Sequence, residues 1–247
     1  MSGHNKWSTI KHKKAATDAK RGKVFTKLIK EITIAARQGG SDPTANPRLR
    51  TAIATAKSSS MPANNIDRAV KKGAGELDGG QMEEGTYEGY GPSGVAVLME
   101  VVTDNRNRTT ADVRHCLSKN NGNLGENGCV SWMFDRRGII LLKDENLDED
   151  TVMEAGLEAD GFEDLEIEDG RTTVYTDPSK LYVVLEVLEK AGYENEEAKI
   201  GYIPQNMVKL EGKKVQQMMR LIDMLEENED VTEVYTNADF DPADLED

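Results

Sequence analysis

The sequence predicts an α+β protein of several domains, with an N-terminal helical bundle followed by two α/β domains, one inserted into the other. Three observations support this prediction. Residues 1–72 contain 16 Lys and Arg and 4 Asp and Glu, a net charge of +12, whereas the remainder contains 15 and 41, a net charge of −26. Apolar residues recur at helical spacing in the basic part, and short strand patterns alternate with helices after it. A glycine-rich segment at 73–85 lies between the two patterns and reads as a linker.

The basic first third predicts three short helices. Apolar residues recur at helical spacing over 25–36, and the Gly-Gly pair at 39–40 ends this run in the manner of a C-cap. An Asn-Pro pair at 46–47 is typical of an N-cap followed by a first-turn proline, and a Met-Pro pair at 61–62 starts the third helix. Short connections between amphipathic helices predict a small bundle. Residues 1–20 are too polar to fold alone, so we expect a flexible basic arm or a loosely docked helix there.

Beyond the linker, strands alternate with helices. Outside residues 137–204, we expect strands at 95–103, 129–134, 207–210 and 231–235 and helices at 109–120 and 213–227. Inside them, we expect strands at 139–142, 164–168, 172–176 and 196–202 and helices at 149–159 and 178–191. The inner order is β-α-β-β-α-β, which is that of the ferredoxin-like motif.

This element order predicts three domains. A basic arm and helical bundle occupy 1–80, an α+β domain is built from 81–136 plus 205–247, and an acidic ferredoxin-like domain is inserted at 137–204. The alternative is three domains in simple series, with the last βαβ unit packed elsewhere. The acidic tail at 237–247 is expected to be disordered.

Composition argues against a secreted, membrane or nucleotide-binding protein. Two cysteines form no disulfide framework, and the lysine-rich N-terminus has no apolar signal region. The longest apolar run, Val95–Met99, is too short to cross a bilayer. We therefore expect a cytoplasmic protein. The glycine-rich stretch at 89–94 precedes a strand instead of opening a helix, so it predicts a turn and not a phosphate cradle.

The sequence predicts no catalytic residue, metal or cofactor. Acidic residues are abundant but lie in solvated runs, and the run at 144–150 lacks the glycine and glutamate of a calcium loop. His115 and Cys116, together with Cys129, lack the C-x-x-C pair or second histidine of a metal site. A hydrolase or metalloenzyme that uses them is therefore the weaker alternative, and we expect no small-molecule substrate.

The basic part instead predicts a nucleic-acid interface, because lysine and arginine bind phosphates and release their counterions. Trp7 can stack on an unpaired base or pack into the bundle. Arginines in the loop 103–109 can bind phosphate or RNA edges, or cap a helix and pair with nearby acids. No helix-turn-helix signature is present, so direct reading of a DNA sequence is not expected. The candidate contact residues are His4, Lys6, Trp7, Lys11, His12, Lys13, Lys14, Lys23, Lys27, Lys30, Arg48, Arg50, Lys57, Arg106 and Arg108.

Five blocks of the sequence resemble the YebC/PmpR family, and the resemblance covers nearly the whole chain. The blocks are Met1–Trp7, Met61–Lys72, Tyr87–Ala96, Thr103–Thr109 and Gly128–Phe134. Cys129 and Ser131 stand where small residues such as serine and alanine are usual. The resemblance implies an N-terminal helical bundle and two α+β domains, one inserted in the other. It also implies a probable transcriptional regulator that binds DNA and has no enzymatic activity. Some members look instead like translation factors that act on ribosomes, as does the mitochondrial translational activator of cytochrome c oxidase.

We therefore expect a non-enzymatic, nucleic-acid-binding regulatory protein, a probable DNA-binding transcriptional regulator of the YebC type. The alternative is a ribosome-associated translation factor that binds ribosomal RNA and assists elongation, with Arg106 and Arg108 as a second contact to a folded RNA. A protein-interaction scaffold that uses the acidic inserted domain is a further alternative. The expected partner is DNA or ribosomal RNA, in the latter case within the ribosome, and no membrane contact is expected.

Overall fold

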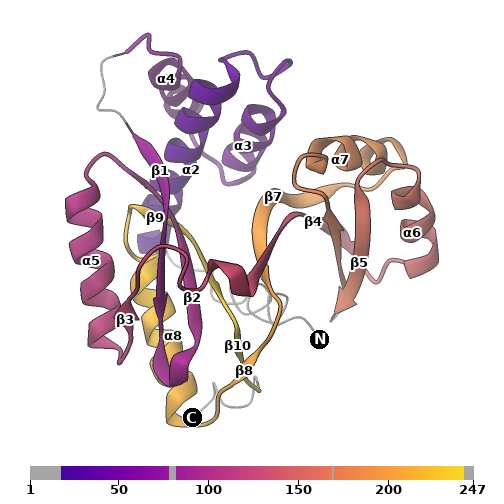
Figure 1. Cartoon of the computed structure of the whole chain (residues 1–247). Coiled ribbons are helices and arrows are strands. Elements are labelled where there is room, and N and C mark those ends of the chain that lie inside the picture. The colour runs from indigo at the N-terminus through magenta and orange to yellow at the C-terminus, as the bar shows by residue number, and fades with distance from the viewer. Residues whose placement is uncertain (1–17, 78–81, 169, 242–247) are drawn as a thin grey trace. The chain divides into compact units, whose positions relative to one another are not determined.

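The computed structural model describes residues 18–77, 82–168 and 170–241, and the chain divides into two compact units (Figure 1). One unit consists of Met1–Phe134 with Pro204–Asp247, and the other of Asp135–Ile203. Each unit mixes helices with a four-stranded sheet, and the described part of the chain contains seven α-helices. The protein is therefore of mixed α and β structure, as the sequence predicts.

The three helices expected in the basic part are present. They are α2 (Asp18–Gly39), α3 (Pro47–Ser58) and α4 (Ala63–Gly73). Asn46 is the N-cap predicted for α3, because its Oδ1 accepts a hydrogen bond from Leu49 N at 3.1 Å. Its Nδ2 donates to the carbonyl oxygens of Ala35 and Gly40, each at 2.8 Å. This one side chain therefore starts α3 and ties it to the end of α2.

The sheet of the first unit is built from segments that precede and follow the second unit in the sequence. Its strand order is β3-β1-β2-β9, and α5 and α8 contribute to its core. The elements are β1 (Glu83–Tyr90), β2 (Ala96–Thr103), α5 (Arg106–Lys119), β3 (Asn123–Leu124), α8 (Lys213–Glu226) and β9 (Val231–Thr236), with a short 3-10 turn, η1 (Pro92–Gly94). Because β9 pairs antiparallel with β2, residues after 204 complete a sheet begun before residue 104.

Three expectations for this unit are wrong. Strand β1 was expected as linker and turn, because its sequence, EEGTYEGY, has few apolar residues. The strand expected at 129–134 is instead a loop with a 3-10 turn, η2 (Ser131–Met133). In the tail, which was expected to be disordered, β10 (Ala238–Asp239) pairs in parallel with β8 (Val208–Lys209), and Phe240 is buried.

The second unit has the element order predicted for it. Its elements are β4 (Phe134–Glu145), α6 (Glu149–Leu157), β5 (Phe162–Glu168), β6 (Arg171–Thr176), α7 (Leu181–Lys190) and β7 (Asn195–Pro204). The strand order is β5-β6-β4-β7, so β6 lies between β5 and β4. Ile140 and Val174 from the sheet pack with Val184 and Leu188 of α7 in the core. Residues 135–203 contain 20 Asp and Glu and 7 Lys and Arg, a net charge of −13.

Candidate nucleic-acid interface

Helix α3 presents a basic face to solvent. Its core positions, Leu49, Ala52 and Ala56, are buried against the other two helices. Arg50 and Lys57, seven positions apart and therefore on one side of the helix, are exposed. The amphipathic spacing of α3 thus turns two cations outward.

Helix α4 repeats this arrangement. Ile66 and Ala69 are buried, and at Gly73 a Cβ atom would overlap the carbonyl oxygen of Thr33, so α4 lies directly against the backbone of α2. On the opposite side, Arg68 and Lys71 are exposed. Since α4 ends at Gly73, Lys71 also lies in the last turn, where the helix dipole favours a cation.

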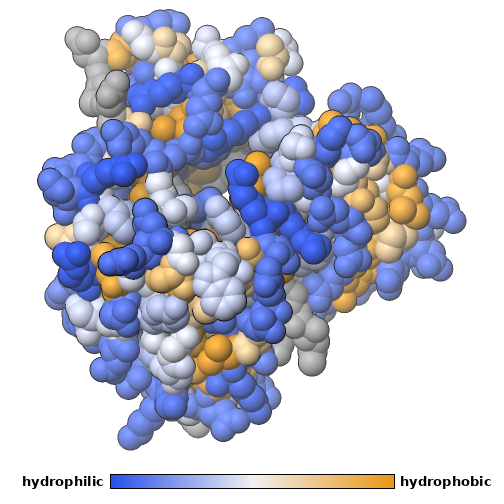
Figure 2. All heavy atoms as spheres, in the orientation of Figure 1, coloured by the Kyte–Doolittle hydropathy of each residue, from blue (hydrophilic) through white to orange (hydrophobic). Residues whose placement is uncertain are grey.

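The outward cations of the two helices are available to a ligand. Arg50, Lys57, Arg68 and Lys71 form no ion pair with any residue in the described ranges. Only four residues, Ser59–Pro62, separate α3 from α4, so the two basic faces are close along the chain. We call Arg50, Lys57, Arg68 and Lys71 the α3–α4 cations. Hydrophilic residues cover much of the visible surface of both helices in Figure 2.

Sequence reasoning found only half of this set. Arg50 and Lys57 were among the predicted contacts, whereas Arg68 and Lys71 were not, although the same helical spacing places them outward.

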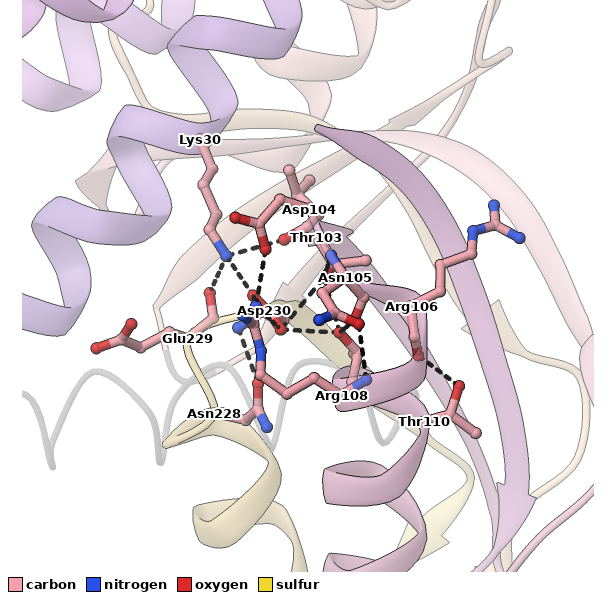
Figure 3. A network of polar contacts seen from close by, with 12 residues as sticks. Lys30, Thr103, Asp104, Asn105, Arg106, Arg108, Thr110, Asn228, Glu229 and Asp230 are labelled. Carbon is pink, nitrogen blue, oxygen red and sulfur yellow. Dashed lines mark hydrogen bonds and ion pairs between the residues drawn. The ribbon is translucent and has the colours of Figure 1, made fainter. Parts of the chain in front are cut away.

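Lys30, one of the predicted contact residues, does not face solvent but is buried, with 8% of its surface exposed. Its Nζ donates to the carbonyl oxygens of Val102 and Glu229 at 2.9 and 2.7 Å and to Asp230 Oδ1 at 2.8 Å (Figure 3). All three ammonium protons therefore have acceptors within the protein. Lys30 joins α2 to the sheet and is removed from the candidate interface.

Asp230 forms ion pairs with both Lys30 and Arg108. Arg108 Nη2 donates to Asp230 Oδ2 at 2.8 Å, and the Thr109 hydroxyl donates to the same oxygen at 2.8 Å (Figure 3). Burial alone would raise the pKa of Asp230, but the hydrogen bonds from Lys30, Arg108 and Thr109 lower it to about 2. The carboxylate is therefore ionised at neutral pH and partly neutralises both cations.

The two arginines of the predicted loop belong to the first turn of α5. Asn105 caps this helix by accepting a hydrogen bond from Arg108 N at 3.1 Å. Arg106 Nε lies 2.9 Å from Glu83 Oε2, and Arg108 contacts Asp104 as well as Asp230. The second expectation for this segment, a helix cap whose arginines pair with acids, describes this geometry, and α5 begins three residues before the predicted start at 109.

Other predicted contacts on the helices are paired or partly buried. Arg48 Nε lies 2.7 Å from Glu31 Oε1, and its Nη2 lies 2.8 Å from Glu84 Oε1. Burial would lower the pKa of this guanidinium, but its bonds to the two glutamates raise it above the ordinary value. Lys23 lies 3.9 Å from Glu227, and Lys27 is half-buried.

The remaining predicted contacts lie outside the described residues. They are His4, Lys6, Trp7, Lys11, His12, Lys13 and Lys14.

The residues considered for catalysis do not form a common site. His115 is exposed on α5, whereas Cys116 is buried on the same helix and Cys129 is half-buried in the loop before η2. Burial raises the pKa of both thiols, which favours the unreactive protonated form. Within 18–77, 82–168 and 170–241, no group of three or more His, Cys, Asp or Glu side chains could hold a metal ion. No described helix combines the length and apolar character needed to cross a membrane.

Comparison with known proteins identifies relatives along nearly the whole chain. A model of the TACO1/YebC N-terminal domain matches residues 5–76, and a model of the TACO1/YebC second and third domain matches residues 82–238. A probable transcriptional regulatory protein of Geotalea uraniireducens is 57% identical over 246 residues, which cover 100% of this chain and 99% of the relative. The protein of the same description from Geobacter sulfurreducens has the same identity and coverage.

A solved structure is also similar. The crystal structure of the conserved hypothetical protein Aq1575 from Aquifex aeolicus matches with a TM-score of 0.85 at 48% sequence identity. The match covers 94% of this chain and 96% of that one. Together with the two matching domain models, these similarities show that the chain belongs to the TACO1/YebC family.

Proposed function

We propose that this protein is a non-enzymatic, DNA-binding transcriptional regulator of the cytoplasm, and that the α3–α4 cations bind the phosphate backbone of its DNA. One contrast between two sets of cations supports this proposal. The α3–α4 cations are exposed and have no ion-pair partner among the described residues, whereas Lys30, Arg48 and Arg108 form ion pairs with carboxylates. Relatives that match the whole chain are named probable transcriptional regulatory proteins, which supports a regulatory role.

The charge distribution predicts which part of the protein a nucleic acid approaches. The second unit, with a net charge of −13, repels a polyanion, whereas the basic helices attract one. Nucleic acid is therefore expected to approach the helices of the first unit and to avoid residues 135–203. The attraction is of the kind that depends steeply on salt, because each phosphate contact releases counterions.

The test is fluorescence anisotropy of a labelled 30-bp duplex between 50 and 200 mM salt. The variant K57E/R68E is compared with R114E/R220E, which reverses two exposed cations of α5 and α8 that have no ion pair in the described structure. We expect K57E/R68E to weaken binding at least tenfold and to make the slope of log K against log salt shallower by about 2. The control should change the affinity and the slope much less.

Equal loss in the two variants would show that only net charge matters and would contradict a role for α3 and α4. Duplex DNA should also compete better than ribosomal RNA for the same protein. If ribosomal RNA competes better by tenfold or more, the protein is a ribosome-associated factor and the proposed DNA-binding function is wrong.

A further inference from the structure

The loop between β3 and η2 is fixed by one buried carboxylate. Glu88, which is 4% exposed, accepts a backbone hydrogen bond from Gly128 at 2.7 Å and from Val130 and Ser131 at 2.8 Å each. Burial alone would raise the pKa of Glu88, but these three N–H groups lower it below the ordinary value. The loop therefore closes around an ionised carboxylate by charge-assisted hydrogen bonds, which are stronger than neutral ones.

The 3-10 turn η2, which follows this loop, presents an indole to solvent. Trp132 is 65% exposed, although its Nε1 donates to the carbonyl oxygen of Cys129 at 3.1 Å. The same carbonyl accepts the hydroxyl of Tyr90 at 2.9 Å. Since the indole has a single polar hydrogen and that hydrogen is used internally, a partner meets only the ring. The ring is held in place before any ligand arrives.

Within this loop, Asn127 is exposed, and its amide group has no hydrogen-bond partner in the described structure. Asn121, just before β3, and Asn123, within β3, are also exposed and have no side-chain hydrogen bond there. The other large exposed hydrophobic residues of the described chain belong to other segments, namely Val24, Leu77, Leu157 and Val183. Aromatic hot spots of protein interfaces lie within well-packed pockets, and no other large exposed apolar residue lies in this loop.

An exposed aromatic ring that follows a loop with a free amide matches the chemistry of an unpaired nucleobase. The base stacks on the ring, and amides, which both donate and accept, can bind the base edges. We propose that Trp132 is a stacking site for an unpaired base of single-stranded DNA or RNA. Asn127, in the turn from Glu126 to Cys129, is the candidate for contact with the base edge because it is the free amide closest to Trp132 in the sequence. The inference rests on the proposed function only in taking nucleic acid as the partner. The stacking site is formed by residues other than the α3–α4 cations.

The fluorescence of Trp132 itself provides the test. The chain has two tryptophans, so W7F leaves Trp132 as the sole indole. This protein is titrated with dT12, with rU12 and with a 12-bp duplex, and the affinity for labelled dT12 and rU12 is measured by anisotropy for W132A and W132F in the same background. We expect the two single strands to quench the emission and the duplex to leave it nearly unchanged. W132A should bind single strands about 5- to 150-fold more weakly, the loss typical of one stacked base, and W132F should retain most of the affinity.

Quenching by dT12 alone or by rU12 alone would assign the site to DNA or to RNA. Emission that neither dT12 nor rU12 quenches, or equal affinities of W132A and W132F for the single strands, would overturn the stacking site. The failure of the proposed function has a different signature, because that function is tested by duplex binding to K57E/R68E and R114E/R220E, which leave Trp132 unchanged. If duplex DNA does not bind while single strands still quench Trp132, the stacking site holds and the DNA-binding function fails.

Discussion

Lys30 Nζ and Asp230 Oδ1 lie 2.8 Å apart, although 200 positions separate the two residues in the sequence. Lys30 belongs to α2 and Asp230 directly precedes β9, so this ion pair joins the basic helices to the strand that completes the sheet. Both side chains are buried, and each has further hydrogen bonds that satisfy its remaining polar atoms. The orientation of α2 on the sheet therefore depends on a fully bonded charge pair.

Removing the charge of Asp230 should destabilise the protein strongly. In D230N, Lys30 stays buried without its counterion, and loss of one partner from a buried pair costs about 3–5 kcal/mol. Urea denaturation at pH 7 measures the change in the free energy of unfolding. The matched control is E229Q, which removes the neighbouring exposed carboxylate while Glu229 still accepts the Lys30 bond through its backbone. A similar small loss in both variants would contradict the role of the pair.

The pair should also make stability depend on acid pH. The pKa of Asp230 is about 2 in the folded protein and 3.8 in a free side chain, so its stabilisation is complete above about pH 4 and is lost as pH falls through 2. The two values correspond to roughly 2 kcal/mol. The stability difference between wild type and D230N, measured by urea denaturation at pH 7, 4, 3 and 2.5, should therefore narrow only below pH 4. A constant difference down to pH 2.5 would contradict the assigned pKa.

Neutralising Glu88 should loosen the loop that carries Trp132. In E88Q an amide NH2 group replaces one acceptor oxygen, so at least one of the N–H groups of Gly128, Val130 and Ser131 loses its partner. An unsatisfied buried donor costs about 1–3 kcal/mol. Hydrogen exchange of these amides should accelerate in E88Q and remain slow in E126Q, which changes an exposed glutamate of the same loop. Equal protection in the two variants would show that Glu88 does not hold the loop.

Two glycine-to-alanine substitutions should have opposite effects on stability. At Gly73 a new methyl group overlaps the Thr33 carbonyl and the Ala36 side chain, and we expect G73A to lose about 1–3 kcal/mol. At Gly22, within α2, the methyl group has free space, and helix propensity predicts a gain of up to about 1 kcal/mol. Thermal unfolding followed by circular dichroism compares them. A G73A protein as stable as G22A would contradict the close contact between α2 and α4.

Local signals predicted much of the fold. Asn46 before Pro47 is a capping pattern that depends only on neighbouring residues, and the helix begins where that pattern places it. Strand β1 was missed because its glutamates and glycines carry no strand signal of their own, and it is stabilised by its pairing with the apolar β2.

The candidate binding residues were harder to predict, because charge alone does not distinguish a free cation from a paired one. Lys30 and Lys57 look alike in the sequence, but Lys30 meets a carboxylate 200 residues away while Lys57 faces solvent. No local pattern indicates such a partner. Helical spacing could still have found Arg68 and Lys71, since both lie opposite the buried residues of α4.

The pairing of β2 with β9 constrains how the chain folds while it is being synthesised. Thr103 ends β2, and Val231 begins β9, 128 residues later. At typical rates of about 5–20 residues per second, the ribosome needs roughly 6–25 s to make that stretch. Residues 135–203 are continuous and emerge before β9, so we expect them to fold while the earlier sheet still has an open edge. Strand β2 therefore remains without its partner β9 until the end of synthesis. In a nascent chain that stalls in this interval, the unpaired apolar strand is exposed to aggregation and to chaperones.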